Sequence, residues 1–379
     1  MIFGYHGSYL RIDLATGRAQ PVPIPEEVLA RFVGGVGLGA WICLQEGGAE
    51  AEPLAAEAPV VYALSPLVGT PLTTSAKFAI VARSPLTGLL SDAISSSHFA
   101  IAAKRAGYDA YVFKGRAPTL SRVIVDDGRV RLVEATELAG KPSAECGLEG
   151  YRTSAIGPAG ENLVRFATVT NDGRHAGRGG LGASLGAKNL KAFSIRGSRL
   201  PELADPQGVV EEAQRLSELS LGPATAKYRE LGTISNLLVF NRLAALPSKN
   251  FQDSEFEGAS ELAAEALHEF HAVGRESCAA CTIGCEHVFK TKPGRRVRIE
   301  YETLFALGSL LGISDRDQVL AAAELCDRFG LDTISTGGTI AFAMEAGYGG
   351  LSFGDADAVL EMIGLIAARK GAGDALAEG

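Results

Sequence analysis

The 379-residue sequence has no excess of positive charge and no long apolar run. Its 36 lysines and arginines are outnumbered by 44 aspartates and glutamates, so we expect none of the basic surface that nucleic-acid binders use. The longest apolar helical stretch, Leu304–Ile313, is about half of the roughly 20 residues that a membrane-spanning helix needs. The start, MIFGYHGSYLRIDL, lacks a basic segment followed by an apolar one, so we expect neither a signal peptide nor a membrane partner.

Cysteine is also scarce, at six residues. Cys43, Cys146 and Cys326 stand singly among apolar or small residues. A disulfide framework is not expected in a chain of this length without a secretion signal. We therefore expect a reducing, cytoplasmic compartment.

The other three cysteines are concentrated in GRESCAACTIGCEHVF, as Cys278, Cys281 and Cys285. Thiolates so closely spaced are typical of an iron–sulfur cluster held by one loop, although C-x2-C-x3-C matches neither common ferredoxin spacing. Zinc is the main alternative, because His287 would complete a tetrahedral set. Three buried thiols without a metal are the third reading.

The length predicts two or more domains. The first 200 residues read mainly as strands and turns, with Asp127-Gly128 marking a hairpin between Arg122–Asp126 and Arg129–Glu134. Short helices are expected at Glu26–Phe32 and His98–Ala106. The other strands expected here are Tyr9–Leu14, Val60–Leu64, Lys77–Ala82, Tyr108–Lys114 and Val164–Thr170.

Turn formers and two prolines interrupt the chain at Arg196–Gly208. Beyond them apolar residues recur at helical intervals. The fold class predicted is therefore α+β, with a β-rich domain at residues 1–200 and an α-helical domain at residues 201–379. The helices expected are Val209–Leu221, Thr233–Leu243, Glu261–Phe270, Thr303–Leu311, Asp317–Phe329, Thr333–Ala346 and Ala356–Lys370.

Two stretches are rich in glycine. FVGGVGLGAW, Phe32–Trp41, resembles a phosphate-binding loop, but a helix precedes it where a nucleotide fingerprint needs a strand, so a crowded turn is favoured. In NDGRHAGRGGLGASLGAKNLKAF, Asn171–Phe193, glycines surround Arg178 before an expected helix that runs to Leu190. Such a segment suits a phosphate, and a packed turn is the alternative.

Two stretches of the helical region carry carboxylates in notable places. In LCDRFGLDTISTGG, Gly330 and Asp332 suit a helix C-cap and the next N-cap. Alternatively, Asp332 could accept paired hydrogen bonds from an amino-pyrimidinone edge. In IEYETLFALG, Glu300 and Glu302 suit a solvated helix start. Packed among the apolar residues that follow, either would be an acid–base catalyst.

Together these stretches resemble the aldehyde:ferredoxin oxidoreductase family of tungsten enzymes. The shared motifs run in order along the whole chain: RIDLATG, GGVGLGA, SPLVGT, SPLTG, KRAGYDAYVFKG, NDGRHAGRGGLGASLGAKNLKA, ALPSKNF, CAACTIGC, EYETLFALGS and DRFGLDTISTGG. The resemblance implies a [4Fe–4S] cluster rather than zinc, beside tungsten or molybdenum carried by two pterins, with Mg2+ at their phosphates. It implies oxidation of aldehydes to carboxylic acids with ferredoxin or another electron-transfer protein as partner, and it allows a homodimer.

The resemblance also implies roles for individual residues. Cys278, Cys281 and Cys285 match cluster ligands, and Glu302, with Glu300 as the alternative, matches the active-site acid. The expected cofactor-binding positions are Lys77, Ser95, Ser96, Ala176, Gly177, Arg178, Gly179, Asp327, Gly330, Leu331 and Asp332.

Three departures from the family pattern bear on activity. Lys77 replaces an arginine and so loses its planar fork, and Ile94–Ser97 replaces N-S-G-G. The closing GAGDALAEG resembles the middle of the family pattern, so we expect the fourth cluster cysteine and a second pterin motif beyond residue 379 and, without them, neither a stable cluster nor turnover. Cys326 is a weaker candidate for the fourth ligand. A non-catalytic paralogue or scaffold subunit of an oxidoreductase complex is the alternative function.

Overall fold

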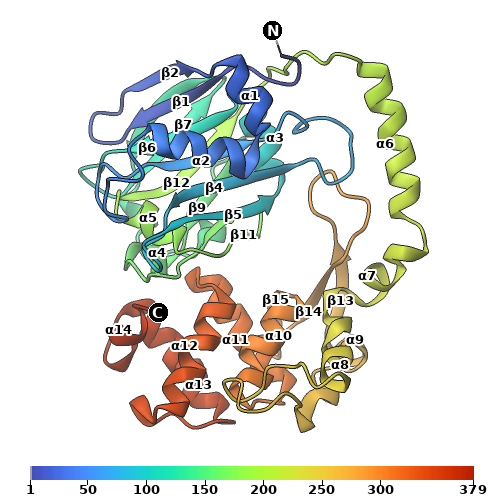
Figure 1. Ribbon diagram of the computed structural model, residues 1–379. Helices are drawn as coiled ribbons and strands as arrows, with labels where there is room; N and C mark the ends of the chain where they lie inside the picture. The colour runs from blue at the N-terminus through green and yellow to red at the C-terminus, as the bar shows by residue number, and fades with distance from the viewer. Residues whose placement is uncertain (1) are drawn as a thin grey trace. The chain divides into compact units, whose positions relative to one another are not determined.

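The computed structural model describes residues 2–379, which form two compact units, residues 2–216 and 217–379 (Figure 1). The boundary lies within helix α6, Pro206–Ser220. The first unit is β-rich and the second is mainly helical, so the predicted α+β fold class is confirmed.

The N-terminal unit contains two six-stranded sheets. In both of them parallel and antiparallel pairs are mixed, and each has a hairpin at one edge. The first sheet has the spatial order β2 (Ala19–Pro23), β1 (Ser8–Asp13), β6 (Ala110–Lys114), β3 (Val60–Leu64), β4 (Lys77–Arg83) and β5 (Leu90–Ser96). The second has the order β11 (Arg174–Ala176), β10 (Val169–Asn171), β9 (Arg152–Ile156), β12 (Leu190–Arg196), β7 (Ser121–Asp126) and β8 (Arg129–Glu134).

The largest core cluster of this unit takes side chains from both sheets and from α3, His98–Arg105. Tyr62 lies at its centre, with its ring edge-on to Phe113 and Phe193 at centroid distances of 5.7 and 5.6 Å. Each large side chain buried in this way contributes about 1.5–3 kcal/mol. These rings therefore tie the two sheets together.

The opposite face of the first sheet is covered by α1, Glu26–Phe32, and α2, Gly35–Gln45. The expectation of a crowded turn at Phe32–Trp41 is therefore wrong, because most of that stretch is helix. Its glycines permit close packing on the sheet: a Cβ at Gly39 would lie 2.7 Å from Val81 Cγ2. Two shorter helices, α4 (Pro158–Glu161) and α5 (Leu181–Gly186), complete the unit.

A buried ion pair joins α3 to the turn before β6. Lys104 Nζ lies 2.5 Å from Asp109 Oδ1, and both side chains are 0 % exposed. The other carboxylate oxygen accepts the backbone N–H groups of His6 and Gly7 at 3.0 and 2.7 Å. Burial lowers the pKa of Lys104, and the Asp109 carboxylate opposes this by stabilising the ammonium form.

The C-terminal unit packs helices beside a three-stranded antiparallel sheet of order β13 (Ala272–Glu276), β14 (Glu286–Lys290) and β15 (Arg296–Ile299). This sheet was not foreseen from the sequence. The helices are α7 (Ala226–Leu231), α8 (Leu237–Arg242), α9 (Ala264–His271), α10 (Tyr301–Leu307), α11 (Arg316–Phe329), α12 (Thr333–Glu345), α13 (Ala356–Ala368) and α14 (Ala372–Leu376). Within residues 2–379, no helix is long and apolar enough to cross a membrane.

Candidate functional site

The three clustered cysteines lie on the loop between β13 and β14. None of the three forms a disulfide, all three are half-buried, and the Cys281 N–H donates to the Cys278 carbonyl at 3.1 Å. Positive φ angles at Ala280 and Gly284, 51° and 63°, fold this loop back on itself. Over residues 2–379, no three His, Cys, Asp or Glu side chains are arranged as a finished metal site. The donors have the thiolate chemistry of a cluster, on one short loop, but the structure does not hold them in coordinating geometry.

Two neighbouring residues considered as ligands have other partners. His287 Nε2 is 3.3 Å from the Tyr228 carbonyl, and its ring lies edge-on to His268 at a centroid distance of 4.7 Å. Cys326 is 0 % exposed inside α11. Burial raises the pKa of this thiol, and the adjacent Asp327 raises it further, so the Cys326 thiol stays protonated. Neither arrangement favours metal ligation at these positions.

Arg298 on β15 connects the base of the cysteine loop to α11. Its guanidinium is 2.7 Å from Glu276 Oε2 and 2.9 Å from the buried Glu286 Oε1, which flank the loop. Its positive charge also favours the ionised form of Asp327, the first residue of the D-x-x-G-L stretch, and so opposes the effect of burial, which raises the pKa of that carboxyl. Sequence reasoning missed Arg298. Its place in RRVRIEYE, two residues before Glu300, was the available signal.

Burial raises the pKa of the Asp327 carboxyl to about 7, against the opposing attraction of Arg298. The folded state therefore binds a proton that the unfolded chain releases near pH 4, and stability falls as pH rises between about 4 and 7.

We expect Asp327→Asn, which stays neutral, to remove this loss. Relative to the wild type, the unliganded variant should gain up to about 4 kcal/mol between pH 4 and pH 8, at 1.36 kcal/mol per pKa unit. Urea unfolding of both proteins across this range measures the difference. Parallel stability curves would contradict the raised pKa.

The remaining residues of that stretch form a helix junction. Gly330 ends α11 in the left-handed conformation, with φ 75° and ψ 50°. Asp332 caps α12: its carboxylate accepts the N–H groups of Ile334 and Ser335 at 3.2 and 3.3 Å, and the Ser335 hydroxyl at 2.6 Å. Both capping roles expected from the sequence are confirmed. A ligand at Asp332 would have to share oxygens that already hold the helix start, and Leu331 beside it is buried.

Glu300 and Glu302 stand at the start of α10, where Glu300 is the N-cap residue and Glu302 lies in the first turn. Both carboxylates are exposed, whereas Leu304 and Leu307 on the same helix are buried. Neither glutamate is therefore packed among the apolar residues of α10, which was the arrangement expected of an acid–base catalyst. The geometry matches the solvated helix start.

In the N-terminal unit, the expected cofactor positions gather around β5 and β11, which lie beside one another (Figure 1). Lys77 is exposed and is paired in register with Ser96 across β4 and β5. The Ser95 hydroxyl bonds to Asn171 Oδ1 on β10 at 3.0 Å. The structure thus brings Lys77, Ser95 and Ser96 to one edge.

The segment from Ala176 to Gly179 leads from β11 toward α5 beside this edge. A Cβ at Gly179 would lie 2.2 Å from Ser91 Oγ of β5, and one at Gly180 would lie 1.9 Å from the Arg165 carbonyl oxygen. No atom approaches a Cβ built at Gly177 within 4 Å. Packing therefore accounts for Gly179 and Gly180, whereas it does not account for Gly177, where a side chain would meet no neighbour.

Comparison with known proteins places this two-unit arrangement in a class. Residues 9–197 match the family model of the N-terminal domain of aldehyde ferredoxin oxidoreductase, and residues 209–379 match that of its domains 2 and 3. The chain belongs to the aldehyde ferredoxin oxidoreductase family.

Among its relatives are the tungsten-containing aldehyde ferredoxin oxidoreductases of Pyrococcus furiosus and Thermococcus kodakarensis, each 36 % identical. Both matches cover all of this chain and 66 % of the relative, so the chain spans slightly less than two thirds of their length. The WOR-like subunit of aliphatic sulfonate oxidoreductase from Pyrococcus furiosus is 28 % identical, with the same coverage.

A solved structure has the same fold. The BamBC active-site complex of benzoyl coenzyme A reductase, with 1,5-dienoyl-CoA, matches with a TM-score of 0.86 and 25 % identity, over all of this chain and 62 % of that one. The α+β architecture is therefore shared with a multi-component reductase as well as with the aldehyde enzymes.

Proposed function

We propose that this chain contributes to a tungsten- or molybdenum-pterin oxidoreductase that converts aldehydes to carboxylic acids and passes the electrons to ferredoxin or a similar carrier. The proposal rests on membership of the family and on one observation above the others: three half-buried cysteines, none of them in a disulfide, lie on a single short loop. Disulfide-free thiols of this kind suit a reducing cytoplasm, where we place the protein.

Two groups of residues would hold the cofactors. Cys278, Cys281 and Cys285 would bind a [4Fe–4S] cluster, and the segments at Lys77, Ser95–Ser96, Ala176–Gly179 and Asp327–Asp332 would contact the bis-pterin and a magnesium ion at its phosphates. Bound, the metal would supply two-electron oxidation of the carbonyl and the cluster would carry single electrons. The exposed ammonium group of Lys77 would offset negative charge at the cofactor edge.

The side chains of the protein would accept the protons that the reaction releases. Oxidation of an aldehyde with water to a carboxylic acid releases two electrons and two protons. A carboxylate within reach of the substrate would take up one of these protons and return it to water. The exposed Glu302 carboxylate at the start of α10 is our first candidate, and Glu300 is the second.

The test is anaerobic expression with tungstate or molybdate of this chain together with any sequence encoded beyond residue 379, followed by assays for iron, sulfide, tungsten and molybdenum and for aldehyde-dependent dye reduction. Cofactor with turnover supports the proposal. Lys77 and the sequence Ile94–Ser97 depart from the family pattern and favour a second candidate, a non-catalytic scaffold subunit. Absence of tungsten and molybdenum from cofactor-replete preparations would support that candidate.

Replacing Cys281 by serine should lower bound iron to less than half of the wild-type value, because the cluster loses a thiolate. The control is Cys326→Ala, which removes a buried thiol that we place outside the ligand set. It should leave iron unchanged while costing some stability. Iron analysis after anaerobic reconstitution checks both variants, and the reverse pattern would assign Cys326 to the cluster.

A further inference from the structure

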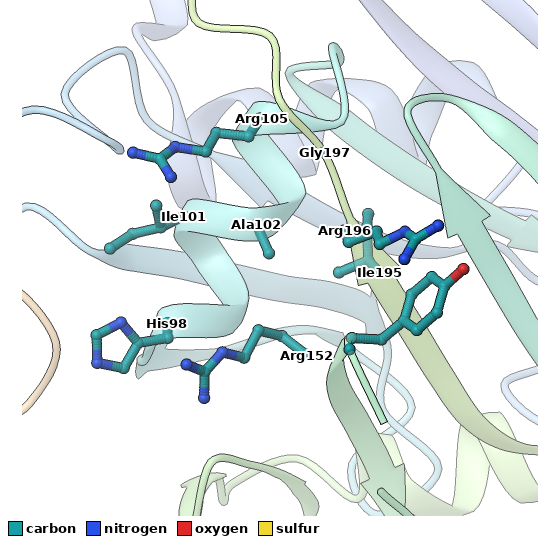
Figure 2. A pocket seen from close by; sticks show the side chains of 10 residues that line it. His98, Ile101, Ala102, Arg105, Arg152, Ile195, Arg196 and Gly197 are labelled. Carbon is teal, nitrogen blue, oxygen red and sulfur yellow. The ribbon is translucent and has the colours of Figure 1, made fainter. Parts of the chain in front are cut away.

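The N-terminal unit has a cavity of about 450 Å3 that contains none of the residues assigned above to cofactors (Figure 2). One wall is a single face of α3, because positions i, i+3, i+4 and i+7 of a helix share one side. The opposite wall comes from the turn before β9 and from the end of β12. Its lining is His98, Ile101, Ala102, Arg105, Gly150, Tyr151, Arg152, Ile195, Arg196 and Gly197.

The charged side chains that line this cavity are all arginines. They are Arg105, Arg152 and Arg196, and no acidic residue is among the lining. Figure 2 shows His98 and Arg152 toward one end of α3 and Arg105 toward the other. His98 and Arg105 are seven residues apart, which is about 10 Å along a helix axis. Arg152 and Arg105 therefore lie toward two separated ends of the cavity, and Arg196 lies on the wall opposite α3.

Acidic residues outside the cavity hold two of the arginines in place. Arg196 Nε and Nη2 bond to the two carboxylate oxygens of Asp126 at 2.8 and 2.6 Å. The Arg196 guanidinium also stacks on the Tyr151 ring, 4.6 Å from its centroid, and the Tyr151 hydroxyl donates to Asp126 at 3.2 Å. Arg152 Nη1 lies 3.5 Å from Asp172 Oδ1. This wall is preorganised, which lowers the entropy lost on binding.

Apolar side chains lie between the two ends. Ile101 and Ala102 are half-buried on the helix wall, and Ile195 on the opposite wall is fully buried. A volume of this size lies within the range of about 300–1,000 Å3 for small-molecule sites, which combine an apolar lining with a few placed polar groups.

We propose that this cavity binds a small organic dianion: a molecule with a phosphate or carboxylate at each end and an apolar middle of about 8–10 Å. One anionic end meets His98 and Arg152, and the other meets Arg105. The apolar middle of the ligand packs against Ile101 and Ala102. An acidic protein surface would use only the charged rim, whereas a small molecule would also fill the volume of about 450 Å3 and contact Ile101 and Ala102.

The test is calorimetric titration of the purified chain with hexane-1,6-diyl bisphosphate. The matched probes are hexyl phosphate, with one anionic end, hexane-1,6-diol, with none, and inorganic phosphate. We expect the bisphosphate to bind about tenfold more tightly than hexyl phosphate, because the second end gains one charge-assisted contact. The diol should not bind measurably.

The decisive variant is Arg105→Ala, which removes an exposed side chain. It should weaken bisphosphate binding about tenfold and leave hexyl phosphate binding nearly unchanged, so the difference between the two probes disappears. Arg152→Ala should weaken both. Arg18→Ala, which removes an equal charge from an exposed residue outside the cavity, should change neither.

Three results would overturn the proposal: equal affinity for bisphosphate and hexyl phosphate, equal effects of Arg105→Ala and Arg18→Ala, or Arg105-dependent binding of decaglutamate without binding of the bisphosphate. The last would assign the cavity to an acidic protein surface. Circular dichroism of each variant confirms that its fold is retained.

Discussion

Replacing Asp109 by alanine is expected to destabilise the N-terminal unit by about 3–5 kcal/mol, a large part of the 5–15 kcal/mol that a typical domain has. The change leaves the Lys104 ammonium group buried without its partner, since both side chains are 0 % exposed. It also removes the acceptor of the His6 and Gly7 N–H groups. At about 2–4 °C per kcal/mol, the melting temperature should fall by roughly 6–20 °C in a calorimetric scan.

Two further variants separate the causes. Lys104→Met with Asp109→Asn removes both charges and keeps an amide oxygen for the two N–H groups, so the double variant should be more stable than Asp109→Ala. Glu212→Ala breaks an exposed ion pair with Arg215 within α6 and should leave the melting temperature nearly unchanged. A melting temperature for Asp109→Ala within about 2 °C of the wild type would show that the ion pair is not needed for stability.

Replacing Glu302 by glutamine is expected to lower aldehyde turnover by about 10²–10⁴-fold in any preparation that carries the metals. Glutamine keeps the size of the side chain but cannot take up a proton. Because Glu302 is exposed on α10 and is not buried among apolar residues, the fold and the metal content should not change. Steady-state dye reduction, with tungsten and iron analysis of the same samples, measures both.

The matched control is Glu300→Gln, two residues earlier at the N-cap of the same helix. It should retain most of the turnover. If Glu300→Gln is the inactive variant and Glu302→Gln is not, the proton acceptor is Glu300. If both are active, neither carboxylate takes part in proton transfer.

Local turn and strand signals predicted much of the N-terminal unit. Asp127-Gly128 marked the hairpin of β7 and β8, and both residues have positive φ, 47° and 86°. The strand Val60–Leu64 and the helix Glu26–Phe32 have the predicted bounds. These elements are short, and the residues within each of them indicate its structure. Their bounds could therefore be predicted from the sequence alone.

Elements stabilised by distant contacts were harder to foresee. Glycine-rich α2 was read as a turn, because nothing local reveals that Gly39 packs against Val81 on β4. The predicted strand Val164–Thr170 is reduced to Val169–Asn171, since the preceding residues are buried in turns. The β13–β15 sheet is held by pairing across the cysteine loop, which masks its strand pattern.

In the candidate site too, features set by the local sequence were predicted, and features set by distant contacts were not. The caps at Gly330 and Asp332 followed from local chemistry. The link through Arg298 did not, because it joins residues 276, 286 and 327, which only the fold brings together. Roles that the sequence assigned by resemblance, in the cluster, pterin and acid positions, remain predictions for the experiments above.

The connection between the chain's start and Asp109 also sets an order of events during synthesis. Strand β1 pairs in parallel with β6, about a hundred residues later in the chain. The N–H groups of His6 and Gly7 likewise have no acceptor until the Asp109 carboxylate is in place. At about 5–20 residues per second, the β1–β2 hairpin spends roughly 5–20 s outside the ribosome before β6 emerges. During that interval one edge of β1 is unpaired, so its backbone groups are open to pairing with other chains until β6 has emerged.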